Sequence, residues 1–338
     1  MILAGDIGGT HARLAFFETN NGSFRLISAT VFPSREYSSL DEIVGKFVAS
    51  SDVRPDSACF GIAGPVRGGR VEASNLPWVV ESKRLAEELH LKNTLLINDL
   101  EANAWGIATL APSDVVPLNQ VKGNPAGNQA VIAAGTGLGE AGMYWDGERY
   151  HIFACEGGHS DFAPRNELEI ELLRYLTKRF GHVSCERVVS GPGLVNVFHF
   201  LRDTGRGKEP KWLTEEMLHG DPAAAISRAA LDGKCPLSER ALDLFISVYA
   251  AEAGNLALKL MATGGVYLGG GIAPKMLSKL AGPLFMQAFV GKGRMQHLLE
   301  AIPVKVITND KAALMGAARC AAVKAGGSER TNEPPVSV

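Results

Sequence analysis

The sequence predicts an α/β protein with two related halves, each a mixed β-sheet flanked by helices. The chain has 338 residues, which is enough for two domains that each bury a core of their own. In the first half, apolar runs and amphipathic segments follow the order strand-strand-strand-helix-strand-(strand)-helix-strand-helix, which is typical of a mixed sheet covered by helices. The second half begins as the first does, with an apolar run, a glycine-rich turn and another β-prone run.

The elements of the first half follow from periodicity and composition. The expected strands are residues 2–7, 11–17, 25–32, 58–63, 70–73 and 94–97. The expected helices are residues 40–48, 85–89 and 100–108. Residues 75–78, Asn-Leu-Pro-Trp, form a polar and aromatic loop that could face a ligand.

A stretch rich in Pro, Gly and Asn at residues 112–128 marks a domain boundary. Beyond it, we expect strands at residues 130–134, 140–144, 151–154, 266–268 and 304–307. Long helices are expected at residues 222–232, 238–261 and 311–325. A capping-box pattern at residues 166–169 opens a further helix, which Gly181 ends and which buries Leu168, Leu172, Leu173 and Leu176.

Composition excludes several classes of function. The formal net charge is −2 and no block rich in Lys or Arg occurs, so a nucleic-acid-binding surface is not expected. No stretch is apolar enough for a membrane span, and the amino terminus does not look like a signal peptide. The five cysteines are scattered without a CxxC pair, which favours a reducing compartment. We therefore expect a cytoplasmic protein.

Two glycines join the first two strands in a way that suggests more than a turn. Asp6 precedes Gly8 and Gly9, and Thr10 follows them. Glycines allow backbone N–H groups to approach a phosphate, Thr10 adds a hydroxyl donor, and Asp6 could hold a cation or its water. An ordinary hairpin with polar residues explains this stretch alone equally well.

Asn98 and Asp99 follow the apolar run 94–97 and precede a helical pattern. In α/β folds, ligands bind beyond the carboxyl ends of the strands, and a carboxylate on rigid backbone at that position suits a general base. A helix N-cap needs the same residue types, so this stretch by itself leaves both interpretations open.

The second half repeats the hairpin pattern as Gly135-Thr136-Gly137-Leu138-Gly139, which we interpret as a glycine-hydroxyl turn. Two phosphate-type hairpins, one in each domain and facing across a cleft, could clamp a polyphosphate. The run Gly269-Gly270-Gly271 after a strand allows the backbone to lie close to a flat group such as a nucleoside.

The loop Glu156-Gly157-Gly158-His159 places an acid and an imidazole around two glycines, which we expect to let the loop bend toward a small ligand. A metal site is an alternative. It is not favoured, because no cysteine or second histidine lies at ligand spacing.

Together these motifs resemble the bacterial-type ATP-dependent glucokinase family of the actin-like sugar-kinase superfamily. The resemblance runs from residue 3 to about residue 320 in family order. The motifs that carry it are Gly5-Asp6-Ile7-Gly8-Gly9-Thr10, Ile97-Asn98-Asp99, Ala134-Gly135-Thr136-Gly137-Leu138-Gly139, residues 156–164 from Glu156 to Pro164, residues 181–188 from Gly181 to Val188, residues 190–196 from Ser190 to Asn196, and Gly269-Gly270-Gly271-Ile272-Ala273-Pro274.

The resemblance implies a set of site residues. Asp99 would be the catalytic base toward the sugar hydroxyl that receives the γ-phosphate. The positions that match the family's glucose contacts are Asn98, Asp99, Glu156, His159 and Glu186, with Asn75 as a further candidate. The nucleotide would be bound at Gly5, Asp6, Ile7, Gly8, Gly9, Thr10, Gly135, Thr136, Gly137, Gly139, Gly270 and Gly271. Mg²⁺ would be held through water by Asp6.

The resemblance also implies an architecture of two ribonuclease-H-like domains with the ligand cleft between them. We expect residues 1–110 with about 309–325 to form the small domain, residues 111–308 the large domain, and residues 326–338 a disordered tail. The expected substrates are D-glucose and ATP, the expected product is glucose 6-phosphate, and a homodimer is expected.

Some features depart from the family or leave alternatives. His11 follows Thr10 where the family commonly has Asn, and the cysteine-rich zinc motif of the related repressor/kinase family is absent. A kinase for another hexose, such as mannose or an amino sugar, is the alternative enzyme. A sugar sensor of the same fold without turnover is the alternative of another class. The sensor is disfavoured because the first phosphate loop begins at residue 5, which leaves no DNA-binding extension before it.

Overall fold

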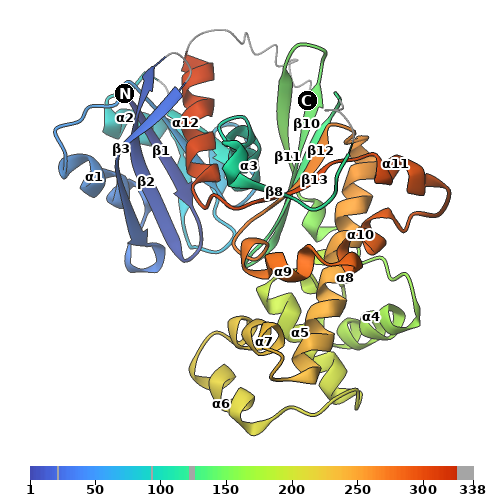
Figure 1. Cartoon of the computed structure of the whole chain (residues 1–338). Helices are drawn as coiled ribbons and strands as arrows, with labels where there is room; N and C mark the ends of the chain where they lie inside the picture. Colours follow the sequence, from blue (N-terminus) through green and yellow to red (C-terminus); the bar gives the residue numbers. More distant parts are fainter. Residues whose placement is uncertain (21–22, 93, 122–125, 326–338) are drawn as a thin grey trace. The chain divides into compact units, whose positions relative to one another are not determined.

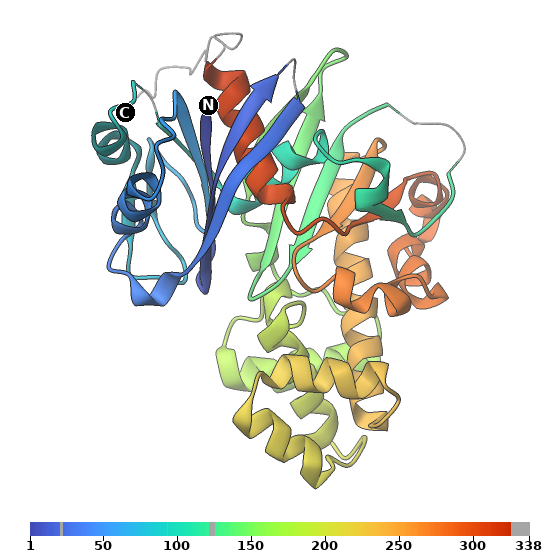
Figure 2. The same cartoon turned by 60° about the vertical axis from the view of Figure 1, so that its left-hand side comes forward.

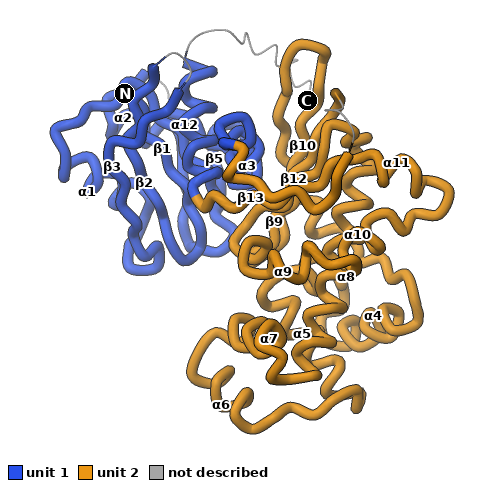
Figure 3. Tube along the Cα trace, viewed as in Figure 1, with its two compact units in different colours: residues 1–111, 311–338 blue, residues 112–310 orange. Residues whose placement is uncertain are grey.

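Each half of the chain forms a mixed sheet with helices packed on it, as the sequence predicts. The computed structural model describes residues 1–20, 23–92, 94–121 and 126–325. Unit 1 consists of Met1–Ala111 and the chain from Lys311 onward, and unit 2 of Pro112–Asp310 (Figure 3). The expected tail at residues 326–338 lies outside the described residues.

The main sheet of unit 1 has the strand order β3-β2-β1-β4-β7. Its strands are β1 (Ile2–Ile7), β2 (His11–Asn20), β3 (Ser23–Pro33), β4 (Ser57–Ile62) and β7 (Thr94–Asn98). The hairpin strands β1, β2 and β3 pair antiparallel, whereas β4 pairs parallel with both β1 and β7. A separate ribbon consists of β5 (Arg70–Glu72) and β6 (Val79–Glu81). Strand β5 was predicted, whereas β6 was not.

Helix α12 joins unit 1 although it comes from the other end of the chain. The helices of this unit are α1 (Leu40–Ala49), α2 (Ser82–Leu89), α3 (Asp99–Ile107) and α12 (Ala312–Ala325). Helix α12 lies against α3 and β1 (Figure 1). The two helices touch through glycine: a Cβ on Gly316 would lie 1.8 Å from the carbonyl oxygen of Ala102. This close crossing fixes the helix that begins with Asp99.

The sheet of unit 2 has the order β11-β10-β9-β12-β13-β8. Its strands are β8 (Val115–Pro117), β9 (Gln129–Ala134), β10 (Leu138–Trp145), β11 (Tyr150–Cys155), β12 (Gly265–Gly269) and β13 (Val304–Ile307). One expectation is corrected here. Leu138 and Gly139 already belong to β10 and pair with Ala134 and Ala133, so the glycine turn consists of residues 135–137 only.

Helix α8 is the centre of unit 2. The helices of this unit are α4 (Glu167–Phe180), α5 (Gly191–Asp203), α6 (Lys211–His219), α7 (Pro222–Leu231), α8 (Pro236–Leu260), α9 (Leu277–Leu280), α10 (Pro283–Val290) and α11 (Gln296–Glu300). Helices α4 to α7 gather around the first part of α8, beyond one end of the sheet (Figures 1 and 2).

Helix α8 is also the only helix within the described ranges that is long and apolar enough to cross a membrane. Its most apolar window is 78% buried inside the protein, and it packs against α5, α7, α10 and β9. It is therefore accounted for as a core helix.

The beginning of α4 differs from the predicted capping box in one bond. Asn166 caps the helix by accepting from the Glu169 backbone N–H at 3.0 Å. The Glu169 carboxylate, however, accepts from the Arg165 backbone N–H at 2.7 Å, one residue before the cap. Glu169 is buried, whereas Leu168 and Leu173, which were expected in the core, are half-buried.

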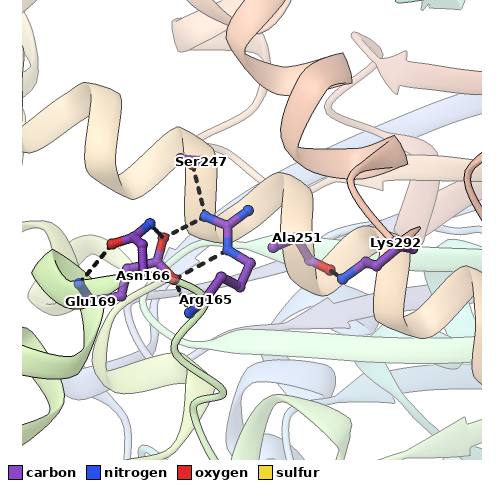
Figure 4. Close-up of polar contacts among 6 residues, drawn as sticks. All are labelled: Arg165, Asn166, Glu169, Ser247, Ala251 and Lys292. Atoms are coloured by element: carbon purple, nitrogen blue, oxygen red, sulfur yellow. Dashed lines mark hydrogen bonds and ion pairs between the residues drawn. The ribbon is translucent and has the colours of Figure 1, made fainter. Parts of the chain in front are cut away.

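Arg165 connects this cap to α8. Its guanidinium binds both carboxylate oxygens of Glu169 and donates to Ser247 Oγ at 2.8 Å (Figure 4). Ala251 lies one turn after Ser247 on α8, and its carbonyl accepts from Lys292 Nζ at 2.9 Å. The charge of Glu169 is thus paired inside the unit, which a buried carboxylate requires.

Candidate active site

In unit 1, the carboxyl ends of three parallel strands meet at one edge of the sheet. Ile7 at the end of β1 is level with Ile62 of β4, and Ile62 is level with Asn98 of β7. The hairpin after β1, the turn at Gly64 and the start of α3 therefore lie beside one another. This is the edge at which α/β proteins bind ligands.

Asn98 is the helix N-cap, and Asp99 is the first residue of α3. The Asn98 side chain is buried. It accepts from the Leu100 backbone N–H at 2.9 Å and donates to the Gly64 carbonyl at 3.2 Å. Asp99 is half-buried, and its Oδ1 also lies 3.0 Å from the Leu100 backbone nitrogen. Asn98 is thus the N-cap, and the Asp99 carboxylate accepts from the same N–H while it stands at the first position of the helix.

The first glycine hairpin is hydrogen-bonded to Ser34, a buried residue that was not predicted from the sequence. Ser34 Oγ donates to the Gly8 carbonyl at 2.8 Å, and its backbone N–H donates to the Thr10 carbonyl at 2.9 Å. No local signal marks Ser34, because the contact depends on the pairing of β2 with β3. Gly9 lies against Asn75: a Cβ on Gly9 would be 2.6 Å from Asn75 Cβ. The structure thus brings the exposed Asn75 to the hairpin.

Gly5 and Ile7 lie within β1 rather than in the loop. A Cβ on Gly5 would be 2.4 Å from the Phe60 ring, so packing accounts for that glycine.

In unit 2, the second glycine turn is tied to Glu186. The Leu138 backbone N–H donates to Glu186 Oε2 at 2.9 Å, and Gly191 N–H donates to the Gly135 carbonyl at 2.8 Å. A Cβ on Gly137 would lie 2.4 Å from the same Glu186 oxygen. Glu186 is half-buried in the single 3₁₀ turn Cys185–Arg187. Glu186 therefore contacts the turn that was assigned to phosphate.

The loop with Glu156 and His159 lies next to Glu186. Its following residues pair with the chain before Glu186: Phe162 N–H donates to the Val183 carbonyl, and Cys185 N–H donates to the Ser160 carbonyl. The exposed side chains of Glu156 and His159 approach each other to 4.0 Å between Oε2 and Nε2. The structure thus brings together the three predicted sugar residues that belong to this unit.

The two glycines of that loop have a different role from the one we expected. A Cβ on Gly157 would lie 1.8 Å from Glu140 Oε2, and a Cβ on Gly158 would lie 1.9 Å from the Leu138 carbonyl oxygen. Neither glycine has a positive φ. They are needed because the loop packs directly on β10, and they do not serve to make the loop bend.

The triple glycine begins with Gly269, the last residue of β12, and lies at the same edge of the sheet as the glycine turn. Gly269 of β12 is level with Ala133 of β9, and Ile272 N–H donates to the Ala134 carbonyl at 3.3 Å. Gly270 has a φ of 78°, and a Cβ on it would lie 2.5 Å from that same carbonyl. At Gly271 and Gly135, by contrast, no protein atom lies within 4 Å of where a Cβ would be. A flat or anionic ligand can therefore approach the backbone at these two glycines.

A mixed sheet in each unit, with glycine hairpins and acidic side chains beyond its strand ends, has the architecture of sugar kinases of the actin-like ATPase fold. A solved structure of a glucokinase from an Antarctic psychrotroph agrees, with a TM-score of 0.80 and 31% identity over 95% of this chain and 98% of that one.

The glucokinase family model matches residues 3–324. The glucokinase of Nostoc sp. is 44% identical over 95% of this chain and 99% of its own length. That of Synechocystis sp. is 43% identical over 95% and 97%. The chain belongs to the glucokinase family, and its activity is that of an ATP-dependent hexokinase-type phosphotransferase acting on glucose.

Proposed function

We propose that Asp99 is the general base of the glucokinase reaction and accepts the proton of the glucose 6-hydroxyl as it attacks the γ-phosphate of ATP. The observation that carries this proposal is the division of roles at the start of α3. Asn98 caps the helix and ties β7 to the turn at Gly64, while the next residue, the half-buried Asp99, carries its carboxylate at the strand-end edge of the sheet. A fixed carboxylate at this edge suits phosphoryl transfer, where catalysis consists mainly of positioning and charge stabilisation.

We propose that the sugar is held by Asn98 and Asn75 of unit 1 and by Glu156, His159 and Glu186 of unit 2. These side chains supply both donors and acceptors, which buried hydroxyl groups need. A site built to pair a hydroxyl strongly rejects sugars that lack it. Glu186 also accepts from the Leu138 N–H, so a shift of Glu186 on sugar binding would be transmitted to the glycine turn.

The nucleotide would be bound mainly by backbone. In unit 1 the candidates are Gly8, Gly9 and Thr10 of the hairpin, with Gly5, Asp6 and Ile7 as the strand that leads into it. In unit 2 they are Gly135, Thr136, Gly137, Gly139, Gly270 and Gly271. The open space at Gly135 and Gly271 supports this assignment, since a phosphate or a base can lie directly on the peptide there.

Asp6 would hold Mg²⁺ through water. Within the described residues, no group of three or more His, Cys, Asp and Glu could hold a metal by itself. Mg²⁺ usually takes one or two carboxylates and completes its shell with phosphates and water, and Asp6 would supply one of these carboxylates. When bound, Mg²⁺ would neutralise phosphate charge, and the chain's part is to fix the position of that charge.

We further propose a cytoplasmic, homodimeric enzyme that serves glycolysis, with unit 1 and unit 2 as its two domains. The five cysteines are free thiols, which suits a reducing compartment. Tyr144 and Phe153, on β10 and the edge strand β11, are 54% and 42% exposed, and burial between two copies would remove these aromatic surfaces from water.

The test of the catalytic base is Asp99→Asn. We expect kcat to fall by roughly 10²–10⁴-fold, the usual contribution of a general base, while the glucose KM changes little because the amide keeps the shape of the side chain. The measurement is coupled ADP release over a range of glucose concentrations. The control is Asp221→Asn at the cap of α7, which makes the same chemical change and should retain wild-type kcat, since Asn and Asp cap equally well. A near-normal kcat for Asp99→Asn would refute the assignment.

A further inference from the structure

Glu140 is a buried carboxyl in contact with the loop Glu156–His159, which we call the sugar loop. The mechanism proposed above does not use Glu140. Its residue is 1% exposed, and its Oε1 has no hydrogen-bond partner among the described protein atoms. Its Oε2 occupies the position that a Cβ on Gly157 would need. Gly157 stands between Glu156 and His159, so the Glu140 carboxyl is the surface on which the sugar loop rests.

The surroundings of Glu140 offer little to stabilise a negative charge. On β11 its cross-strand neighbour is Cys155, and on β9 it is Ile132. The Cys185 thiol, from the 3₁₀ turn at residues 185–187, lies near Glu140 as well. Burial raises the pKa of both thiols, so neither supplies a charge or a strong donor.

Helix α8 adds one like charge and one distant opposite charge. Glu252 is buried as well, but it has partners: Asn255 Nδ2 donates to its Oε2 at 2.8 Å, and Lys259 Nζ lies 3.4 Å from its Oε1. Tyr249, also on α8, donates its hydroxyl to the Ile132 carbonyl. Lys259 and Asn255 thus already bind Glu252. The negative charge of Glu252 in turn disfavours a second negative charge on Glu140.

We propose that Glu140 is a positioning residue of the sugar site: through its contact with Gly157 it sets where Glu156 and His159 stand, and the loop keeps this position only while the Glu140 carboxyl is uncharged. This inference rests on the proposed sugar-binding role of Glu156 and His159. An ionised carboxylate with an unpaired oxygen in this site needs donors or water. The backbone that must move to admit them is that of Gly157.

Burial, and then the charge of Glu252, raise the pKa of Glu140 from 4.5 to about 7. The uncharged form therefore predominates below neutral pH and is lost as pH rises through 7. We expect the glucose KM of the enzyme to rise several-fold between pH 6 and pH 8.5, with a smaller change in kcat.

The decisive variant is Glu140→Gln, which has nearly the same shape and no charge at any pH. Its glucose KM should lack the rise above pH 7 that the wild-type enzyme shows. Glu252→Gln removes the like charge, so its rise in KM should begin at lower pH than in wild type. Glu88→Gln is the matched control, because the pKa of Glu88 is also raised by burial but Glu88 lies in unit 1. Its profile should follow wild type.

Each outcome bears on the proposal. If wild type and Glu140→Gln share one pH profile of glucose KM, or if the wild-type KM is flat over this range, the inference is wrong. Retained thermal stability of Glu140→Gln at pH 6 shows that the comparison concerns folded protein. Glu156→Ala and His159→Ala test the underlying function separately: if neither raises the glucose KM, the proposed sugar site fails. If both substitutions raise the glucose KM but Glu140→Gln has the wild-type pH profile, only the positioning role of Glu140 fails.

Discussion

Replacing Glu140 with Gln should remove a pH dependence of stability from the β10–β11 hairpin. The pKa of Glu140 is about 7 in the folded protein and returns to about 4.5 in the unfolded chain. Because the folded pKa is the higher one, protonation favours the folded state. The stabilisation is fully present below about pH 4.5, declines as pH rises toward about 7, and stays at its lower level above that.

The size of the effect follows from the two pKa values of Glu140. Each pKa unit corresponds to about 1.4 kcal/mol, so the whole loss is about 3 kcal/mol, of which about 2 kcal/mol falls between pH 5 and pH 8. An amide at this position has a cost of its own, since it brings N–H donors into a site with few acceptors. That cost does not depend on pH, so it cancels when variant minus wild type is compared at two pH values.

The assay is hydrogen exchange of the β10 and β11 backbone amides, which reports the opening of this hairpin rather than of the whole chain. After correction for the intrinsic exchange rate, the protection of Glu140→Gln relative to wild type should be greater at pH 8 than at pH 5 by about 2 kcal/mol. Glu88→Gln should leave these amides unchanged at both pH values. A difference between variant and wild type that is the same at pH 5 and pH 8 would refute the reasoning.

Two further predictions concern how the scaffold holds the site. Gly316→Ala places a methyl group on the backbone of α3, so we expect unit 1 to lose about 1–3 kcal/mol in urea unfolding. The matched change Gly45→Ala, in α1, meets only a side-chain oxygen and should be neutral or stabilising by up to about 1 kcal/mol. Ser190→Ala removes the N-cap of α5 and the hydroxyl that donates to the Glu186 carbonyl. It should cost about 1 kcal/mol and raise the glucose KM, whereas Asp221→Ala should have a similar cost with an unchanged KM.

The strands of the five- and six-stranded sheets, except β8, could be predicted because their signal is local. Apolar runs bounded by glycine or polar residues identified β1, β9 and β13 to within a residue. The fold class followed from their order. Among the short elements, the strand β5 was predicted, whereas β6 and α9 were not. Strand β6 and helix α9 have three and four residues, too few for either period to show, and their conformation depends on contacts elsewhere in the chain.

A candidate site residue could be predicted where it directly follows a buried strand in the sequence. Asn98 and Asp99 adjoin a buried strand in the sequence itself, so their place at the sheet edge could be inferred. Ser34 and Glu140 could not be found in this way, because each acts on a loop that is distant in sequence. A glutamate within a strand gives no sign that it will be buried. Its burial results from the register of β10 with β11 and from the packing of α8.

The glycines of the site show why one residue type supported two different inferences. Gly157, Gly158 and Gly270 are required because protein atoms fill the space where a Cβ would stand. At Gly135 and Gly271 that space is open, which leaves room for a ligand to lie directly against the backbone there. The nucleotide site that we propose in unit 2 would use this open backbone. The filled positions hold the loop 156–159 and the β12 turn against the sheet. If Glu140 positions this loop as we propose, the packing at Gly157 is the contact through which its charge state would affect Glu156 and His159.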